Sequence, residues 1–107
     1  MNQGDVYWYT FKEPDKKRPV LILTRNAAIP FLSSIIIASI TTTIRTIPAE
    51  VLLDENDGMR EPCVVTLDNI NTVSKNKLGA FITHLPPAKM REVRTALQYV
   101  FGFDALD

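Results

Sequence analysis

The amino-acid sequence predicts a mainly β fold with a single helix at its C-terminal end. Up to residue 84, the apolar residues lie in short runs rich in β-branched and aromatic side chains, which suit a pleated strand. Residues typical of turns separate these runs. Only the segment after Pro86-Pro87 shows apolar residues at helical spacing. We therefore expect a small β-barrel with one helix laid against it.

The apolar run at residues 35–40 is the strongest strand candidate, and we expect it to be the central strand. Its length matches one buried strand. Thr41, Thr42 and Thr43 follow this run directly, and Arg45 lies two residues further on. A strand that leaves the core with hydroxyl groups and a guanidinium can form an anion-binding rim.

Shorter segments predict the remaining strands. Residues 5–11 follow Gly4 and form the first, and residues 20–24 form the second after Arg18-Pro19, where a proline at the start of a strand is tolerated. Residues 49–53, with Glu50 facing out, and 63–68 are expected to pair around a turn at 54–58, in which Gly58 can take a positive φ. The return strand can continue to residue 73. Residues 81–84 form one more short strand.

The C-terminal segment is the predicted helix. Met90, Val93 and Leu97 recur at helical spacing, and Gly102 is its expected stop. Its charged face is expected to be solvent-exposed. A single helical turn at 75–78, capped by Ser74, is predicted before the last strand.

Length and composition set further bounds. A chain of 107 residues is expected to form one domain, spanning residues 1–107. Twelve basic residues balance twelve acidic ones, so any anion site must be local. The one cysteine suits a reducing compartment, and we expect a cytoplasmic protein because neither a signal peptide nor a membrane span is evident. No Cys or His spacing fits a metal, and no cofactor is expected.

Aromatic residues gather on the first predicted strand. Tyr7, Trp8 and Tyr9 could stack on RNA bases. The alternative is that the rings pack in the core or at a dimer contact, and for Trp8 this is the preferred interpretation.

Histidine and cysteine give little support for catalysis. His84 is the only histidine, which excludes a ribonuclease that works with two. A nucleophile pair of Cys63 and His84 is conceivable, but both lie in apolar strand contexts and are expected in the core.

Three polar residues interrupt or bound the predicted strands: Arg18, Thr41 and Asp68. A guanidinium at a strand start can bind phosphate bidentately. Asp68 is either a structural hydrogen-bond anchor or a site carboxylate, because an unpaired buried carboxylate is costly. Lys16 and Lys17 complete the densest positive cluster of the chain, although for these two lysines a solvated loop is the preferred interpretation.

Four motifs occur in a familiar order: Gly-Asp-Val-Tyr-Trp at 4–8, Arg-Pro-Val-Leu-Ile at 18–22, Ile-Thr-Thr-Thr at 40–43 and Val-Val-Thr-Leu-Asp-Asn at 64–69. Together they resemble the MazF and PemK (Kid) family of toxin endoribonucleases from type II toxin–antitoxin modules. The resemblance implies a compact SH3-like antiparallel β-barrel with a C-terminal helix, a homodimer, and a cognate antitoxin as partner. It also implies metal-independent RNA cleavage, in which the 2′-hydroxyl attacks the adjacent phosphate to give a 2′,3′-cyclic phosphate and a 5′-hydroxyl.

The resemblance also assigns roles to residues. It implies that Arg18 and Thr41 are catalytic, and that Asp68 takes the place of an acidic catalytic residue of the PemK branch. Asp5 occupies an acidic position that helps to arrange the site. As RNA-binding residues we expect Lys16, Lys17, Thr42, Thr43, Asp5 and Arg45.

Two departures from the family pattern stand out. The loop at 12–17 is short, whereas typical members have a longer, glycine-containing loop, and the acidic or histidine partner which that longer loop carries has no counterpart here. Thr66 stands where the PemK branch has arginine. Two alternatives to a nuclease remain: a non-enzymatic toxin that binds DNA gyrase, as CcdB of similar fold does, and a barrel that only binds RNA or a peptide.

Overall fold

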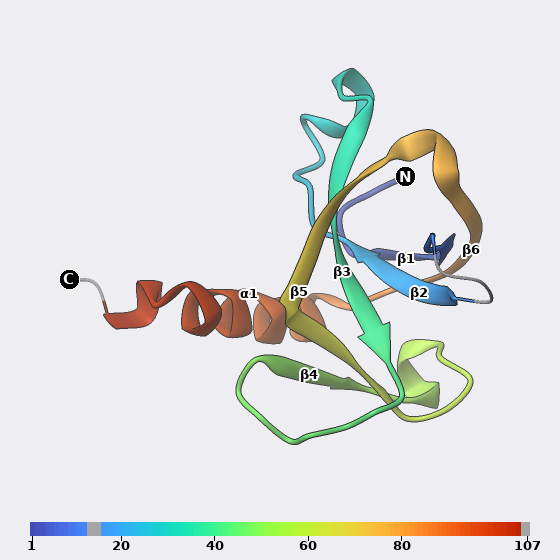
Figure 1. Cartoon of the computed structure of the whole chain (residues 1–107). Helices are drawn as coiled ribbons and strands as arrows, with labels where there is room; N and C mark the ends of the chain where they lie inside the picture. The colour runs from blue at the N-terminus through green and yellow to red at the C-terminus, as the bar shows by residue number, and fades with distance from the viewer. Residues whose placement is uncertain (13–15, 106–107) are drawn as a thin grey trace.

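The computed structural model describes residues 1–12 and 16–105, and its core is one curled antiparallel sheet with a helix on one side (Figure 1). The sheet order is β4-β5-β3-β2-β1-β6. Its strands are β1 (Asp5–Thr10), β2 (Lys17–Ile22), β3 (Ser34–Thr41), β4 (Glu50–Leu53), β5 (Cys63–Ser74) and β6 (Leu78–His84). Helix α1 (Pro87–Phe101) follows, and short 3-10 turns lie at Ile29–Phe31, Glu55–Asp57, Lys75–Lys77 and Phe103–Ala105.

The predicted mainly β architecture with a C-terminal helix is confirmed. Strand β3 is central, because it pairs with β2 on one side and with β5 on the other. The hydrogen-bonded order does not close, since β4 and β6 are its two ends. Figure 1 shows how the long β5 arches from its hairpin with β4 over to β6, which curls the sheet around its core.

Several element boundaries differ from the prediction. Strand β2 begins at Lys17, so Pro19 lies inside it; this is tolerated because pairing with β3 starts only at Val20. Strand β6 begins at Leu78 and is longer than expected. Ser74 precedes the 3-10 turn at 75–77 but its side chain makes no capping bond, and the Lys75 N–H donates instead to the Ser33 carbonyl at 2.9 Å.

Apolar clusters cover both faces of the sheet. One includes Leu21, Ile40 and Val65 and packs against Val93 and Ala96 of α1. The other includes Val20 and Ile37, with Tyr9 and Phe11 packed against it. Because both faces are covered, β3 is buried over most of its length, in agreement with its apolar sequence.

A wide irregularity interrupts the pairing of β3 with β5. Ala38 pairs with Ile70, but the next residue, Ser39, pairs with Thr66. Residues 67–69 of β5 therefore have no partner on β3. An insertion of this kind bends a strand and redirects its side chains.

Helix α1 ends as predicted at Gly102, which has a φ of 72°. Within the described residues, no helix is long and apolar enough to cross a bilayer.

Gly58 is expected to be the least replaceable glycine of the fold. It has a φ of 89°, as the predicted turn requires, and an added Cβ would collide with the Thr83 hydroxyl, which donates to the Asp57 carbonyl at 3.0 Å. Gly58→Ala should lower the free energy of unfolding by about 2 to 4 kcal/mol, from left-handed strain plus overpacking.

Gly102→Ala is the matched control, because its φ is also positive but nothing lies within 4 Å of an added Cβ. It should cost only about 1 kcal/mol. Urea unfolding monitored by circular dichroism measures both values. Equal losses in the two variants would show that the contact with Thr83 contributes nothing.

Candidate functional site

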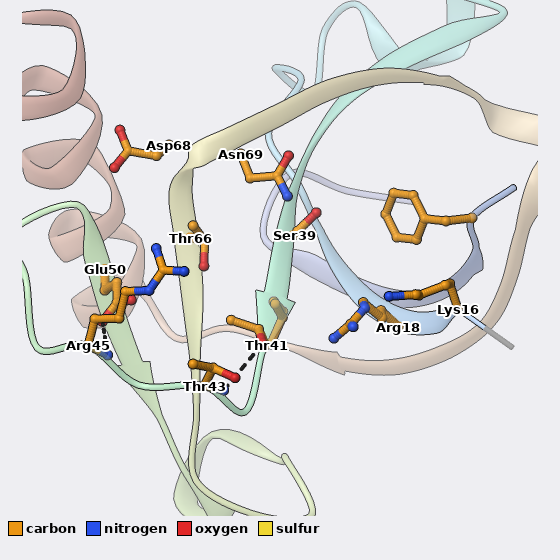
Figure 2. A pocket seen from close by; sticks show the side chains of 12 residues that line it. Lys16, Arg18, Ser39, Thr41, Thr43, Arg45, Glu50, Thr66, Asp68 and Asn69 are labelled. Atoms are coloured by element: carbon orange, nitrogen blue, oxygen red, sulfur yellow. Dashed lines mark hydrogen bonds between the residues drawn. The ribbon is translucent and has the colours of Figure 1, made fainter. Parts of the chain in front are cut away.

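A groove of about 500 Å³ lies where the C-terminal end of β3 meets its neighbours, and we call it the Arg18 groove (Figure 2). Most of its polar lining comes from strands β2 to β5. It is lined by Phe11, Lys16, Arg18, Ser39, Ile40, Thr41, Thr43, Arg45, Glu50, Thr66, Asp68 and Asn69.

Sheet register brings Arg18 and Thr41 together. Val20 pairs with Ser39 at the end of the antiparallel β2–β3 ladder, and Arg18 and Thr41 lie two residues beyond this pair on the same two strands. Both side chains are partly buried and line the groove. The two residues predicted to be catalytic thus come from neighbouring strands, just beyond the last ladder pair, and line the same groove.

The hydroxyl of Thr41 is oriented by a backbone N–H group two residues further along the chain. Its oxygen accepts a hydrogen bond from the Thr43 N–H at 3.2 Å (Figure 2). A threonine hydroxyl has one proton to donate and two lone pairs to accept with. Because one lone pair is used by Thr43, the proton can be directed into the groove toward an anion.

A row of three polar residues, one each from β3, β5 and β4, crosses the floor of the groove. Ser39 pairs with Thr66, and Thr66 pairs in turn with Glu50 on β4. Ser39 is 6% exposed, and the Thr66 hydroxyl is buried without a hydrogen-bond partner in the described chain. Sequence analysis did not assign a role to Ser39, although a serine inside the run at 35–40 was a visible signal.

Glu50 shapes the loop that carries Arg45. Its Oε1 accepts the backbone N–H groups of Arg45 and Thr46, each at 3.0 Å. Thr46 has a φ of 58°, which is strained for a β-branched residue. Glu50 was expected to face solvent, but it is partly buried because its carboxylate holds this loop. Figure 2 shows the Arg45 guanidinium directed inward beside Thr66.

Asp68 lines the groove but lies apart from the other two predicted catalytic residues. It is exposed and belongs to the unpaired segment at 67–69. In Figure 2 its carboxylate points toward the helix and away from Arg18 and Thr41. The bend in β5 is the physical reason, because it turns Asp68 outward from the strand.

The six predicted RNA-binding residues do not all line the same groove. Lys16, Thr43 and Arg45 line the Arg18 groove. Lys17 and Thr42 line a second groove, which Arg18 and Thr41 also border.

Asp5 lines neither groove. It is 5% exposed, and its carboxylate accepts the Asn2 N–H and contacts His84 Nδ1, both at 2.8 Å. Burial, and after it the Asp5 carboxylate, raises the pKa of Tyr7. This placement makes Asp5 an anchor between β1 and β6, where sequence analysis expected a residue that arranges the site.

The geometry opposes a Cys63–His84 nucleophile. Cys63 is buried, as predicted, and burial together with nearby carboxylates raises its pKa to about 11. The thiolate is therefore scarce at neutral pH. His84 was expected in the core but its side chain is 54% exposed, because it stands at the end of β6 and pairs with Asp5. Within residues 1–12 and 16–105, no group of three or more His, Cys, Asp or Glu could hold a metal ion.

Comparison with known proteins connects this arrangement with a family. Residues 2–101 match the sequence model of the PemK-like, MazF-like toxins of type II toxin–antitoxin systems. Endoribonuclease MazF3 of Mycobacterium tuberculosis is 39% identical over 90 residues, which cover 84% of this chain and 87% of the relative. Probable endoribonuclease MazF5 of the same organism is 37% identical over 97 residues, covering 90% and 88%.

Solved structures agree with the sequence relatives. The Mycobacterium tuberculosis toxin MazF-mt6 superposes with a TM-score of 0.84 at 35% identity, covering 92% of this chain and 96% of that one. An endoribonuclease from a mycobacterial species, solved in complex with its cognate antitoxin, gives a TM-score of 0.86 at 31% identity, covering 95% of both chains. By its sequence and its fold, the chain belongs to the PemK-like, MazF-like toxins of type II toxin–antitoxin systems.

Proposed function

We propose that this toxin is an endoribonuclease that cuts RNA in the Arg18 groove, without a metal ion. The observation that carries the proposal is that Arg18 and Thr41, from the neighbouring strands β2 and β3, line one groove together with Lys16 and Arg45. The chain as a whole has no net charge, but this groove carries Lys16, Arg18 and Arg45 against Glu50 and Asp68, a surplus of one positive charge that would attract a phosphate chain. Matched relatives are named endoribonucleases, which supports the same reaction class.

The reaction is an in-line displacement at phosphorus. The 2′-oxygen of the nucleotide before the cut attacks the adjacent phosphate, and the bond from phosphorus to the 5′-oxygen breaks. A 2′,3′-cyclic phosphate and a 5′-hydroxyl result. Negative charge develops on the non-bridging oxygens, where a fixed guanidinium and hydroxyl stabilise it.

Arg18 and Thr41 divide this work. Arg18 keeps its proton at neutral pH, so it serves as an electrostatic clamp and as a hydrogen-bond donor to the departing 5′-oxygen. Thr41 donates its hydroxyl proton to a non-bridging oxygen, since one lone pair of the hydroxyl oxygen already accepts the Thr43 N–H. RNA rather than DNA is the substrate class, because the attacking 2′-hydroxyl exists only in RNA.

We propose that Asp68 does not act as a catalytic base. Its carboxylate points away from Arg18 and Thr41, so we propose that it contacts RNA further along the groove. The 2′-proton then leaves to water, and water returns a proton to the 5′-oxygen. Asp68→Asn is accordingly expected to alter binding more than the rate of the chemical step.

The partners follow from the same groove. We propose that a cognate antitoxin inhibits the toxin by occupying the Arg18 groove, and a related mycobacterial endoribonuclease has been solved with its antitoxin. We further propose a cytoplasmic homodimer, in which residues 1–107 of each copy form one toxin domain. Exposed apolar side chains such as Phe31, 87% exposed, and Leu52, 52% exposed, are available for such contacts.

The alternatives have less support. A gyrase-binding toxin or a simple RNA- or peptide-binding barrel would not need a guanidinium and a hydroxyl from neighbouring strands in one groove. Neither alternative matches the enzyme names of the relatives.

Purified protein mixed with long RNA in excess EDTA is expected to cut it. The fragments should carry 2′,3′-cyclic phosphate and 5′-hydroxyl ends. Arg18→Ala and Thr41→Ala should each lower the cleavage rate by about 100-fold or more, because each removes a donor to developing charge. Gel analysis of fragments and enzymatic end-labelling measure rate and end chemistry.

Arg94→Ala is the matched control, since it also removes a guanidinium but from an exposed position on α1 that lines neither groove, and it should retain the wild-type cleavage rate. Intact RNA in the presence of folded wild-type protein would overturn the proposed function. Products with 3′-hydroxyl ends would overturn the mechanism alone.

The Glu50 carboxylate is expected to act through Arg45. Glu50→Ala releases the loop and should weaken RNA binding about tenfold, roughly 1.4 kcal/mol. Glu50→Gln keeps an oxygen that can accept both N–H groups and should bind nearly as the wild type does. Binding is measured by fluorescence anisotropy with an RNA whose 2′-hydroxyl at the mapped cut is replaced by hydrogen.

Arg45→Ala should reduce the slope of log affinity against log salt by about 0.7, the value for one phosphate contact on a single strand. In that background, Glu50→Ala should have no further effect. If Glu50→Gln lost as much affinity as Glu50→Ala, the charge of Glu50 rather than its bond to the loop would be responsible.

A further inference from the structure

A second groove, of about 440 Å³, opens on the other side of Arg18 and Thr41, and we call it the Trp8 groove. The residues that matter for its chemistry are Trp8, Lys17, Arg60, Glu61 and Phe81. Sequence analysis preferred a packing role for Trp8, but this ring is only partly buried and lines the groove.

The two grooves meet at the predicted catalytic pair. Arg18, Ile40 and Thr41 line both of them. A phosphate held by Arg18 and Thr41 would therefore have one groove on each side. The nucleotides on the two sides of that phosphate can then enter different grooves.

Two neighbours contact Trp8. The Lys17 Nζ lies 5.3 Å from the centroid of the indole ring, which is cation–π contact. Strand β6 passes close to the Trp8 backbone at Gly79, where an added Cβ would lie 3.2 Å from the Trp8 carbonyl oxygen and 3.4 Å from its Cβ. The indole itself is only partly buried and lines the open groove, so it is available for stacking.

The surroundings of the ring favour a nucleotide. Phe81 is 55% exposed and adds a second aromatic side chain to the lining. Lys17, Arg18 and Arg60 provide three positive charges against the single negative charge of Glu61. Aromatic faces combined with a cationic rim are the two features that bind single-stranded nucleic acid without demanding a particular sequence.

We propose that the Trp8 groove binds the nucleobase next to the cut phosphate, with the base stacked on the Trp8 indole. This inference rests on the proposed function, because it takes the phosphate at Arg18 and Thr41 as its reference point. It makes Trp8 a substrate-binding residue on the side of the cut opposite to the Arg18 groove.

Trp8 is the only tryptophan of the chain, so its fluorescence reports on this groove directly. The main probe is an RNA oligonucleotide spanning the mapped cut, with the attacking 2′-hydroxyl replaced by hydrogen. Two shorter probes keep the nucleotides on only one side of the cut phosphate. We expect emission to be quenched by the full probe and by one of the two shorter probes, but not by the other.

Removal of a single base provides the sharper comparison. An abasic nucleotide next to the cut, on the side identified by the shorter probes, should abolish quenching and weaken binding about tenfold, within the range for one stacked base. An abasic nucleotide two positions further away should leave quenching intact.

Variants supply an independent readout. Trp8→Phe should keep most of the affinity because it keeps an aromatic face, whereas Trp8→Leu should raise KM about tenfold with a smaller change in kcat. Phe101→Leu is the matched control, since Phe101 is 57% exposed on α1 and lines neither groove. It should retain wild-type kinetics.

The outcomes separate the two proposals. If wild-type protein cuts RNA but its emission does not respond to any probe, the Trp8 groove does not bind a base and this inference fails alone. Quenching by an acidic peptide but not by RNA would likewise overturn it. If folded wild-type protein does not cut RNA at all, the proposed function fails first.

Discussion

The antiparallel register of β2 against β3 is the constraint on which the site depends. It places Val20 beside Ser39 in the core, and Arg18 and Thr41 follow two residues beyond this pair, where the core ends. The same ladder thus supplies both the stability of the central strand and the alignment of the pair. A shift of one residue would turn Arg18 and Thr41 to opposite faces of the sheet. The rigid sheet is therefore what gives the groove its fixed donors.

Two local departures from regular structure complete the groove. The segment at 67–69, which has no partner on β3, interrupts the pairing next to Thr66, and Asp68 turns outward there. The strained backbone at Thr46, held by Glu50, directs the neighbouring Arg45 inward. Strain that persists beside a cationic groove is typical of functional sites, because the surrounding contacts must hold it in place. Both features place a charged side chain, Asp68 or Arg45, in the lining of the groove, although the chain as a whole has no net charge.

Most of the fold could be predicted from local patterns. The apolar run at 35–40, the turn at Gly58 and the helix ending at Gly102 follow from side-chain shape and backbone freedom, which are local properties. Arg18 and Thr41 were also recognisable as polar residues at strand ends. The placements of Asp5, His84 and Asp68 were not predictable, because they depend on which strands pair and where β5 bends. Pairing and bending are set by distant contacts, which no local pattern encodes.

The central claim is that Arg18 and Thr41 act together on one phosphate. A double-mutant cycle of Arg18→Ala and Thr41→Ala, measured as single-turnover cleavage of one RNA, tests it most directly. Residues that act as a unit are strongly non-additive, so the double variant should be about as slow as the slower single variant. If the two losses simply multiplied, the residues would act independently, and the account of a shared phosphate site would be wrong.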